Sequence, residues 1–146
     1  MKYDKDKFKE VLEPHHRTYW KIAYTKLQRK MQSLKSSLKK RSEESNVLFK
    51  IDMEDLRKMF YKSYGQSCKY CRKKLTIRNM VCDHIIPLAK NGDSTVDNLQ
   101  LICKSCNTRK GPLDEKDFIE LIMWVETLKE ETQEYVLRKL AKGGRY

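Results

Sequence analysis

Cys68-Lys69-Tyr70-Cys71 and Cys103-Lys104-Ser105-Cys106 are two Cys-x-x-Cys pairs, separated by the 31 residues 72–102. The two residues between the cysteines of a pair turn the backbone, so that both thiolates can bind one tetrahedral ion. Two such pairs complete a four-cysteine zinc site with no open position. A redox pair and a set of disulfides are the alternatives. Structural zinc contributes about 10–16 kcal/mol of apparent binding energy. We therefore expect this module to need metal to fold.

The fifth cysteine, Cys82, has no partner in the sequence, and its type favours a small buried apolar residue. The N-terminus Met1-Lys2-Tyr3-Asp4 lacks an apolar signal segment, and no stretch approaches the 18 or so apolar residues of a membrane span. We therefore expect a cytoplasmic protein with reduced thiols and no membrane association.

The net charge of +12 is concentrated in two parts of the chain, with +9 in residues 1–41 and +6 in residues 68–112. Pro14 to Ser42 contains nine Lys/Arg and no acid. A solvated helix face would also carry such charge, but a polyanion explains the uneven distribution better. The expected nucleic-acid contacts in this region are Arg17, Lys21, Lys26, Arg29 and Lys30.

The chain divides into a basic helical arm (residues 1–45), a cysteine-bearing module (46–112) and a C-terminal helical extension (113–146). A long helix is expected from about His15 to Lys40, with Pro14 before it and His15 and His16 on its surface. Its apolar stripe either packs on the domain or forms a self-associating coil; it comprises Trp20, Tyr24, Leu27, Met31, Leu34 and Leu38. A polar break at Ser42–Asn46 would follow.

Shorter elements surround the cysteines. We expect a helix over Met53–Lys62 with Asp52 as its N-cap, and a short helix from about Cys103 that carries Asn107. A last helical region begins after Asp114 and either continues or breaks near Glu130. Short strands are predicted at residues 47–51, 75–77, 80–82 and 99–102.

Asp83-His84-Ile85-Ile86-Pro87-Leu88 and Asp97-Asn98-Leu99-Gln100-Leu101 lie between the cysteine pairs. Closing the four thiols around one ion would bring Asp83, His84 and Asn107 together. A carboxylate, an imidazole and an amide oxygen are what metal-assisted phosphodiester hydrolysis requires. Because adjacent strand residues point to opposite faces, the strand should end, bend or bulge at Asp83 and His84.

In this order of motifs, residues 66–111 resemble the zinc-stapled HNH endonucleases. The resemblance implies an α+β fold with a small ββα-metal core, flanked here by N- and C-terminal helices. It implies His84 as general base and Asp83 and Asn107 as ligands of the catalytic ion. It also implies that Asn98 holds the loop that aims His84. A buried core histidine, an ordinary turn residue and a helix-surface residue are the alternatives for His84, Asn98 and Asn107.

The resemblance also implies DNA, double-stranded, as the partner. Cleavage would leave 5′-phosphate and 3′-hydroxyl ends, by nicking or double-strand cutting and by a monomer or homodimer. Two oxygen ligands favour Mg²⁺ or Mn²⁺ as the catalytic ion. The expected phosphate contacts of the module are Arg109, Lys110, Arg78, Lys73 and Lys74. A phage, mobile-element or restriction/defence enzyme is expected; a zinc-dependent nucleic-acid-binding module without catalysis, or a thiol redox protein, is the competing interpretation.

Overall fold

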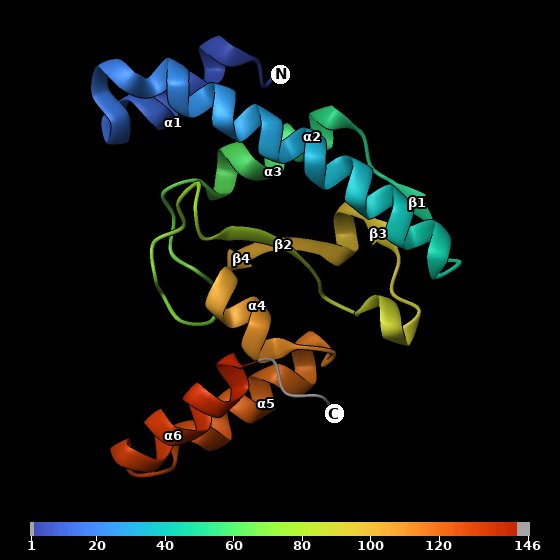
Figure 1. The fold of residues 1–146 in the computed structure, drawn as a ribbon, viewed down its shortest axis with the longest axis vertical. Helices are drawn as coiled ribbons and strands as arrows, with labels where there is room; N and C mark the ends of the chain where they lie inside the picture. Colours follow the sequence, from blue (N-terminus) through green and yellow to red (C-terminus); the bar gives the residue numbers. More distant parts are fainter. Residues whose placement is uncertain (1, 143–146) are drawn as a thin grey trace.

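The computed structural model describes residues 2–142 of the chain. Helices lie on both sides of a small central sheet (Figure 1): α1, α2 and α3 lie on one side and the pair α5 and α6 on the other. The strands β2 and β4 and the helix α4 lie between these groups. The fold is therefore the expected α+β core with helices from both ends of the chain.

Two helices form the N-terminal arm, where one was expected. α1 spans Lys5–His16 and begins at Asp4, whose side chain accepts a hydrogen bond from Lys7 N at 3.0 Å. A 3-10 turn, η1 (Arg17–Tyr19), leads into α2 (Trp20–Glu44), so the expected start at His15 is wrong. Pro14 lies in the last turn of α1, where its missing N–H leaves one bond to the preceding turn unmade.

The polar break expected from Ser42 begins three residues later, because α2 runs on to Glu44. Ser42 is fully buried, and its hydroxyl bonds to the carbonyl oxygen of Leu38 one turn earlier at 2.6 Å. Burial against the rest of the protein therefore overrides the local preference of a serine for a helix end.

The apolar stripe of α2 packs on the domain, which is the first of its two predicted alternatives. Trp20, Leu27, Met31 and Leu38 are buried within the chain itself. Trp20, Leu27 and Met31 share their core with residues of α1, α3 and the cysteine module; these include Phe8, Leu12, Phe60, Cys68, Met80, Leu101 and Ile102. Leu38 lies in a second cluster with Ile51, Leu56 and Leu99. The boundary at residue 45 stays a prediction, and the hydrophobic core lies on both sides of it.

The segment after α2 contributes one short strand and one helix. β1 is only Phe49–Lys50, within the expected 47–51, and it pairs in parallel with β3 (Ser94–Thr95). α3 spans Met53–Ser63 and begins, as expected, at Asp52, whose capping box with Asp55 satisfies both orphan N–H groups.

The central unit is a ββα arrangement. β2 (Met80–His84) and β4 (Leu99–Cys103) pair antiparallel, with Asp83 opposite Gln100, and α4 (Lys104–Lys110) follows directly. Two single turns, η2 (Leu88–Lys90) and η3 (Val96–Asn98), lie in the connection between the strands.

The strand expected at residues 75–77 is wrong. The Asn79 side chain accepts a hydrogen bond from Thr76 N at 2.8 Å and donates one to Lys74 O at 2.9 Å. These bonds close a turn and take backbone groups that a strand would need.

The C-terminal region is two helices, so the predicted break is confirmed. α5 spans Glu115–Glu126 with Asp114 as its N-cap, and α6 spans Glu130–Ala141 and packs against α4. Met123 and Trp124 of α5 are exposed. Among the described helices, none combines the length and the apolar character needed to cross a bilayer.

Candidate active site

The four paired cysteines converge on one point. The Sγ atoms of Cys68, Cys71, Cys103 and Cys106 all lie within 4.8 Å of one another, and those of Cys71 and Cys103 are 3.5 Å apart. A tetrahedral ion with Zn–S bonds of about 2.3 Å separates its sulfurs by about 3.8 Å. The cluster therefore fits a single tetrahedral metal ion, as the sequence predicted.

Backbone N–H groups prepare one of these sulfurs to carry negative charge. Burial alone would raise the pKa of the Cys68 thiol, but N–H groups of Cys103, Cys71 and Tyr70 outweigh it and lower the pKa to about 7. Burial raises the pKa of Cys106. A cation bound among the four sulfurs would compensate the charge of its buried thiolates.

Of the four residues predicted for the active site, all but Asn98 line one shallow pocket of about 260 Å³ at the end of β2. Asp83, His84 and Asn107 all contribute to its wall. β2 ends at His84 without a bulge, which is one of the three predicted solutions, and both neighbouring residues line the pocket at the strand end. The other lining residues are Arg41, Cys82, Pro87, Leu88, Ala89 and Gly111.

The Asp83 carboxylate is held from two sides. Lys110 Nζ lies 3.3 Å from its Oδ1 and 3.1 Å from its Oδ2, and Gln100 Nε2 donates to Oδ2 at 2.9 Å. Gln100 Nε2 also donates to the Tyr70 hydroxyl at 2.8 Å, and that hydroxyl bonds to Glu115 at 3.1 Å. This network fixes the orientation of the Asp83 carboxylate.

The His84 imidazole is held by Ser94, whose Oγ lies 2.8 Å from Nε2. The pKa of His84 is lowered, chiefly by burial and then by repulsion from Arg41 and Lys110, while Asp83 opposes these effects. The imidazole is therefore neutral at neutral pH, the state that can accept a proton.

Asn98 bridges the two ends of the loop that follows His84. Its Oδ1 accepts from Ile86 N at 2.8 Å, and its Nδ2 donates to Ile86 O at 2.9 Å and to Asp93 O at 2.7 Å. A Cβ on Gly92 would lie 1.7 Å from Ile86 O, so this loop closes only around a glycine. These contacts match the loop-holding role that the resemblance implies for Asn98.

The oxygen donors of the pocket fit a hard divalent cation. A carboxylate offers about four lone-pair sites, and the Lys110 and Gln100 bonds use three on Asp83, which leaves one on Oδ1. Asn107, which carries an amide oxygen, is half-buried and lines the same pocket. Carboxylate and amide oxygens are the ligands that Mg²⁺ and Ca²⁺ prefer.

Sequence reasoning missed Arg41, the one cation from the N-terminal arm that lines this pocket. No ion pair involves Arg41 within residues 2–142, so its charge is available to a ligand. The run of nine Lys/Arg without an acid from Pro14 to Ser42, which includes Arg41, was the available signal. Cys82 lines the pocket too, half-buried as a small residue, and burial followed by the Asp83 charge raises its pKa to about 12.

Lys110 corrects one expectation. Its side chain is fully buried against Asp83, and its Nζ also donates to His84 O at 2.8 Å. It therefore organises the site from inside and does not face solvent as a phosphate contact. Arg109, its neighbour, is half-buried.

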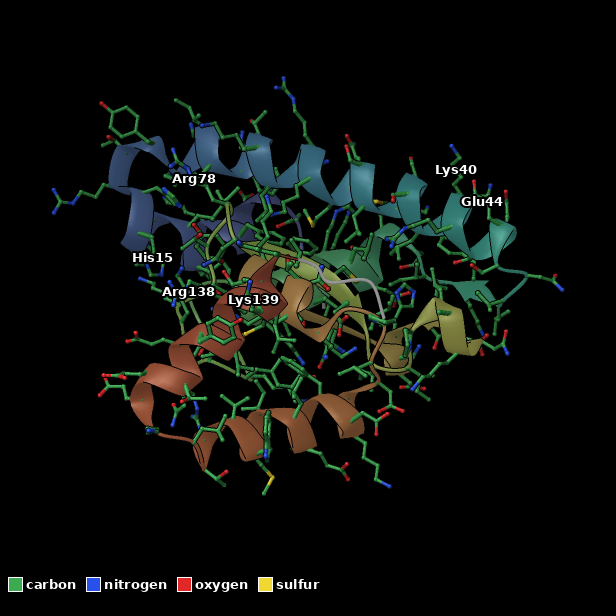
Figure 2. The ribbon with its side chains drawn as sticks, turned by 60° about the horizontal axis from the view of Figure 1, so that its bottom comes forward. His15, Lys40, Glu44, Arg78, Arg138 and Lys139 are labelled. Atoms are coloured by element: carbon green, nitrogen blue, oxygen red, sulfur yellow. The ribbon has the colours of Figure 1, made fainter. Side chains whose placement is uncertain are left out.

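The remaining predicted contacts lie at the surface. Lys26, Lys74 and Arg78 line a second pocket of about 530 Å³ with His15 and His16, at the N-terminal end of α2. Figure 2 shows His15 and Arg78 at that end of the molecule and Lys40 at the other. His15 and His16 close α1 instead of starting α2. Arg17, Lys21, Arg29 and Lys73 are exposed, whereas Lys30 is half-buried and donates to Ile77 O.

The site lies within a stretch that is similar to a known family. Residues 68–113 match the family model described as HNH endonuclease. A 45-residue segment, 30% of the chain, is 42% identical to the CRISPR-associated endonuclease Cas9 of Corynebacterium diphtheriae. That segment spans 4% of the Cas9 chain, so the similarity concerns the domain and not the rest of that protein.

Proposed function

We propose that this protein is a metal-dependent endonuclease that hydrolyses phosphodiester bonds of DNA. The observation that carries the proposal is the convergence of Asp83, His84 and Asn107 on one pocket, with Arg41 on its wall. A zinc-binding module without catalysis would not need this convergence.

Each residue has a proposed part in the reaction. His84 takes a proton from a water molecule, whose oxygen attacks phosphorus as the bond from phosphorus to the 3′ oxygen breaks. Arg41 pairs with a non-bridging phosphate oxygen. Asp83 and Asn107 would hold Mg²⁺ or Mn²⁺, which when bound supplies positive charge to the developing phosphorane and the departing oxygen. The zinc identity of the ion among the four cysteines is likewise a proposal.

The exposed cations indicate how DNA would lie. Arg41 and Lys26 lie 15 residues apart on α2, which corresponds to about 22 Å of helix, and Lys26 lines the second pocket together with Lys74 and Arg78. DNA bound at the catalytic pocket and following α2 would reach Lys74 and Arg78 within about one turn of the duplex. Replacing both by glutamine should lower the salt dependence of binding by about two phosphate contacts. Lys139→Gln, on the exposed side of α6, is the matched control.

Cleavage of supercoiled plasmid tests the proposal. Wild-type protein with Mg²⁺ or Mn²⁺ should give relaxed or linear DNA, and His84→Ala should slow the reaction by about 10²–10⁴-fold. Glu120→Gln, at an exposed position of α5 outside the site, should cleave at the wild-type rate. Equal rates for the wild type and His84→Ala, or cleavage that continues without the added divalent ion, would contradict the assignment. End sequencing would report site preference, and the ratio of relaxed to linear product would separate nicking from double-strand cutting.

A further inference from the structure

Three consecutive hydrogen bonds connect the His84 imidazole to the backbone of α2. His84 Nε2 lies 2.8 Å from Ser94 Oγ, which lies 2.6 Å from Ser42 Oγ. Ser42 Oγ in turn lies 2.6 Å from the carbonyl oxygen of Leu38. Both serines are fully buried. The chain of bonds is therefore shielded from bulk water.

The last bond determines the direction of the others. A carbonyl oxygen can only accept, so Ser42 donates its single hydroxyl hydrogen to Leu38. Ser42 Oγ must then accept the hydroxyl hydrogen of Ser94. With that hydrogen used, Ser94 Oγ can bond to His84 only as an acceptor, and Nε2 must carry a hydrogen.

A neutral imidazole carries a hydrogen on only one of its nitrogens. We propose that Ser42 and Ser94 are positioning residues that hold His84 in its Nε2–H tautomer, so that Nδ1 accepts the proton of the attacking water. This inference rests on the proposed role of His84 as the base. It adds two residues that neither the motif nor the family match assigns a part.

Both serines are held in place by the surrounding fold. Ser94 N donates to Leu48 O at 2.8 Å, and the parallel pairing of β1 with β3 sets Ser94 opposite Phe49. Ser42 is fixed on α2 by its bond to Leu38 one turn earlier. Ser42 lies outside the matched residues 68–113, so the N-terminal arm completes the hydrogen-bonding of the catalytic pocket.

Removing Ser42 should reverse the tautomer, although Ser42 does not touch His84. In Ser42→Ala the buried Ser94 hydroxyl loses the oxygen to which it donates. His84 Nε2, without its hydrogen, is then the acceptor available to Ser94. The imidazole hydrogen then moves to Nδ1, where it blocks proton transfer from water. Ser94→Ala removes the competing donor, so Nε2 can keep its hydrogen even when Ser42 is absent.

Nitrogen-15 NMR of histidine-labelled, zinc-containing protein, without DNA or added magnesium, reads the tautomer directly. Above the pKa of His84, the wild type should show a protonated Nε2 and an unprotonated Nδ1. Ser42→Ala should show the reverse assignment, and Ser42→Ala/Ser94→Ala should return to the wild-type one. A wild-type spectrum with the hydrogen on Nδ1 would overturn the proposal, whether or not any variant folds.

Plasmid cleavage supplies the second readout. Ser42→Ala should lower kcat about 10- to 100-fold with little change in KM, a smaller loss than the 10²–10⁴-fold that a positioned base contributes in full. Adding Ser94→Ala should restore part of that loss, an effect that damage to packing would not produce. Ser37→Ala, exposed on the same helix, should match the wild type.

Two results would contradict the proposal. One is a double variant that cleaves plasmid no faster than Ser42→Ala, and the other is an unchanged His84 tautomer in Ser42→Ala. Failure of the proposed function looks different. In that case His84→Ala would cleave at the wild-type rate, while the NMR assignments would still follow the serine substitutions.

Discussion

Replacing Lys110 by methionine would remove the cation that organises the Asp83 carboxylate while keeping most of the buried stem. Asp83 would be left with Gln100 as its one remaining side-chain partner among those the structure describes. Removing one member of a buried ion pair costs about 3–5 kcal/mol, because the other charge stays buried and uncompensated. With about 2–4 °C per kcal/mol for a domain of this size, Tm should fall by roughly 6–20 °C.

The pocket adds a second expectation to the Lys110→Met experiment. If Asp83 lies at a cation site, Mg²⁺ should stabilise the variant, by about 1.4 kcal/mol when its concentration is ten times its Kd. The assay is thermal unfolding followed by circular dichroism, with zinc retained and with or without Mg²⁺. Lys90→Met is the matched control, because Lys90 forms half-exposed pairs with Asp114 and Asp117 at 3.8 and 3.4 Å, worth at most about 1 kcal/mol. Equal unfolding midpoints for the two variants would refute the reasoning.

Three further predictions concern the metal cluster, the loop after His84 and the response to acid. Elemental analysis should find one bound zinc per chain in the wild type. Cys106→Ser should lose this zinc, and Cys82→Ser should keep it. If both variants retain zinc, the four-sulfur site is wrong. Asn98→Ala removes three hydrogen bonds and should destabilise the fold by about 2–4 kcal/mol. Hydrogen exchange of the Ile86 amide should become faster, and an unchanged exchange rate would contradict the loop-holding role of Asn98. Burial, and then two neighbouring positive charges, lower the pKa of His16, so the unfolded chain binds its proton more tightly and stability should decline as pH falls below about 6.5. His16→Asn should show a shallower decline of Tm between pH 7.5 and 5.5, and identical profiles would exclude this contribution.

The cysteine pairs and the ββα unit could be predicted because their residue types admit few alternatives. Four thiols at this spacing specify a metal cluster, and closing it brings Asp83 and Asn107 to one pocket wherever the arms lie. The short helix from Cys103 was predicted, whereas the strand predicted at residues 80–82 runs two residues further, to His84.

Residues that depend on distant contacts could not be predicted in the same way. A lysine after an arginine is usually a surface cation, and only the position of Asp83 across the sheet shows why Lys110 is buried. A serine among glutamates usually marks a helix end, and only Ser94, 52 residues later, gives Ser42 a reason to stay inside α2. The prediction of a strand at residues 75–77 failed because the Asn79 side chain forms hydrogen bonds with Thr76 N and Lys74 O and closes a turn there.

Because α2 carries both core residues and Arg41, exchanging the first 45 residues of this protein would disturb the core and the candidate site together. A graft that discarded Leu27 and Met31 would open the hydrophobic interior, and one that discarded Arg41 would alter the catalytic pocket. Loss of activity after such a deletion could not be attributed to weaker DNA binding. A change of DNA preference would have to be sought by substituting only the solvent-facing cations of α2, with its other residues kept.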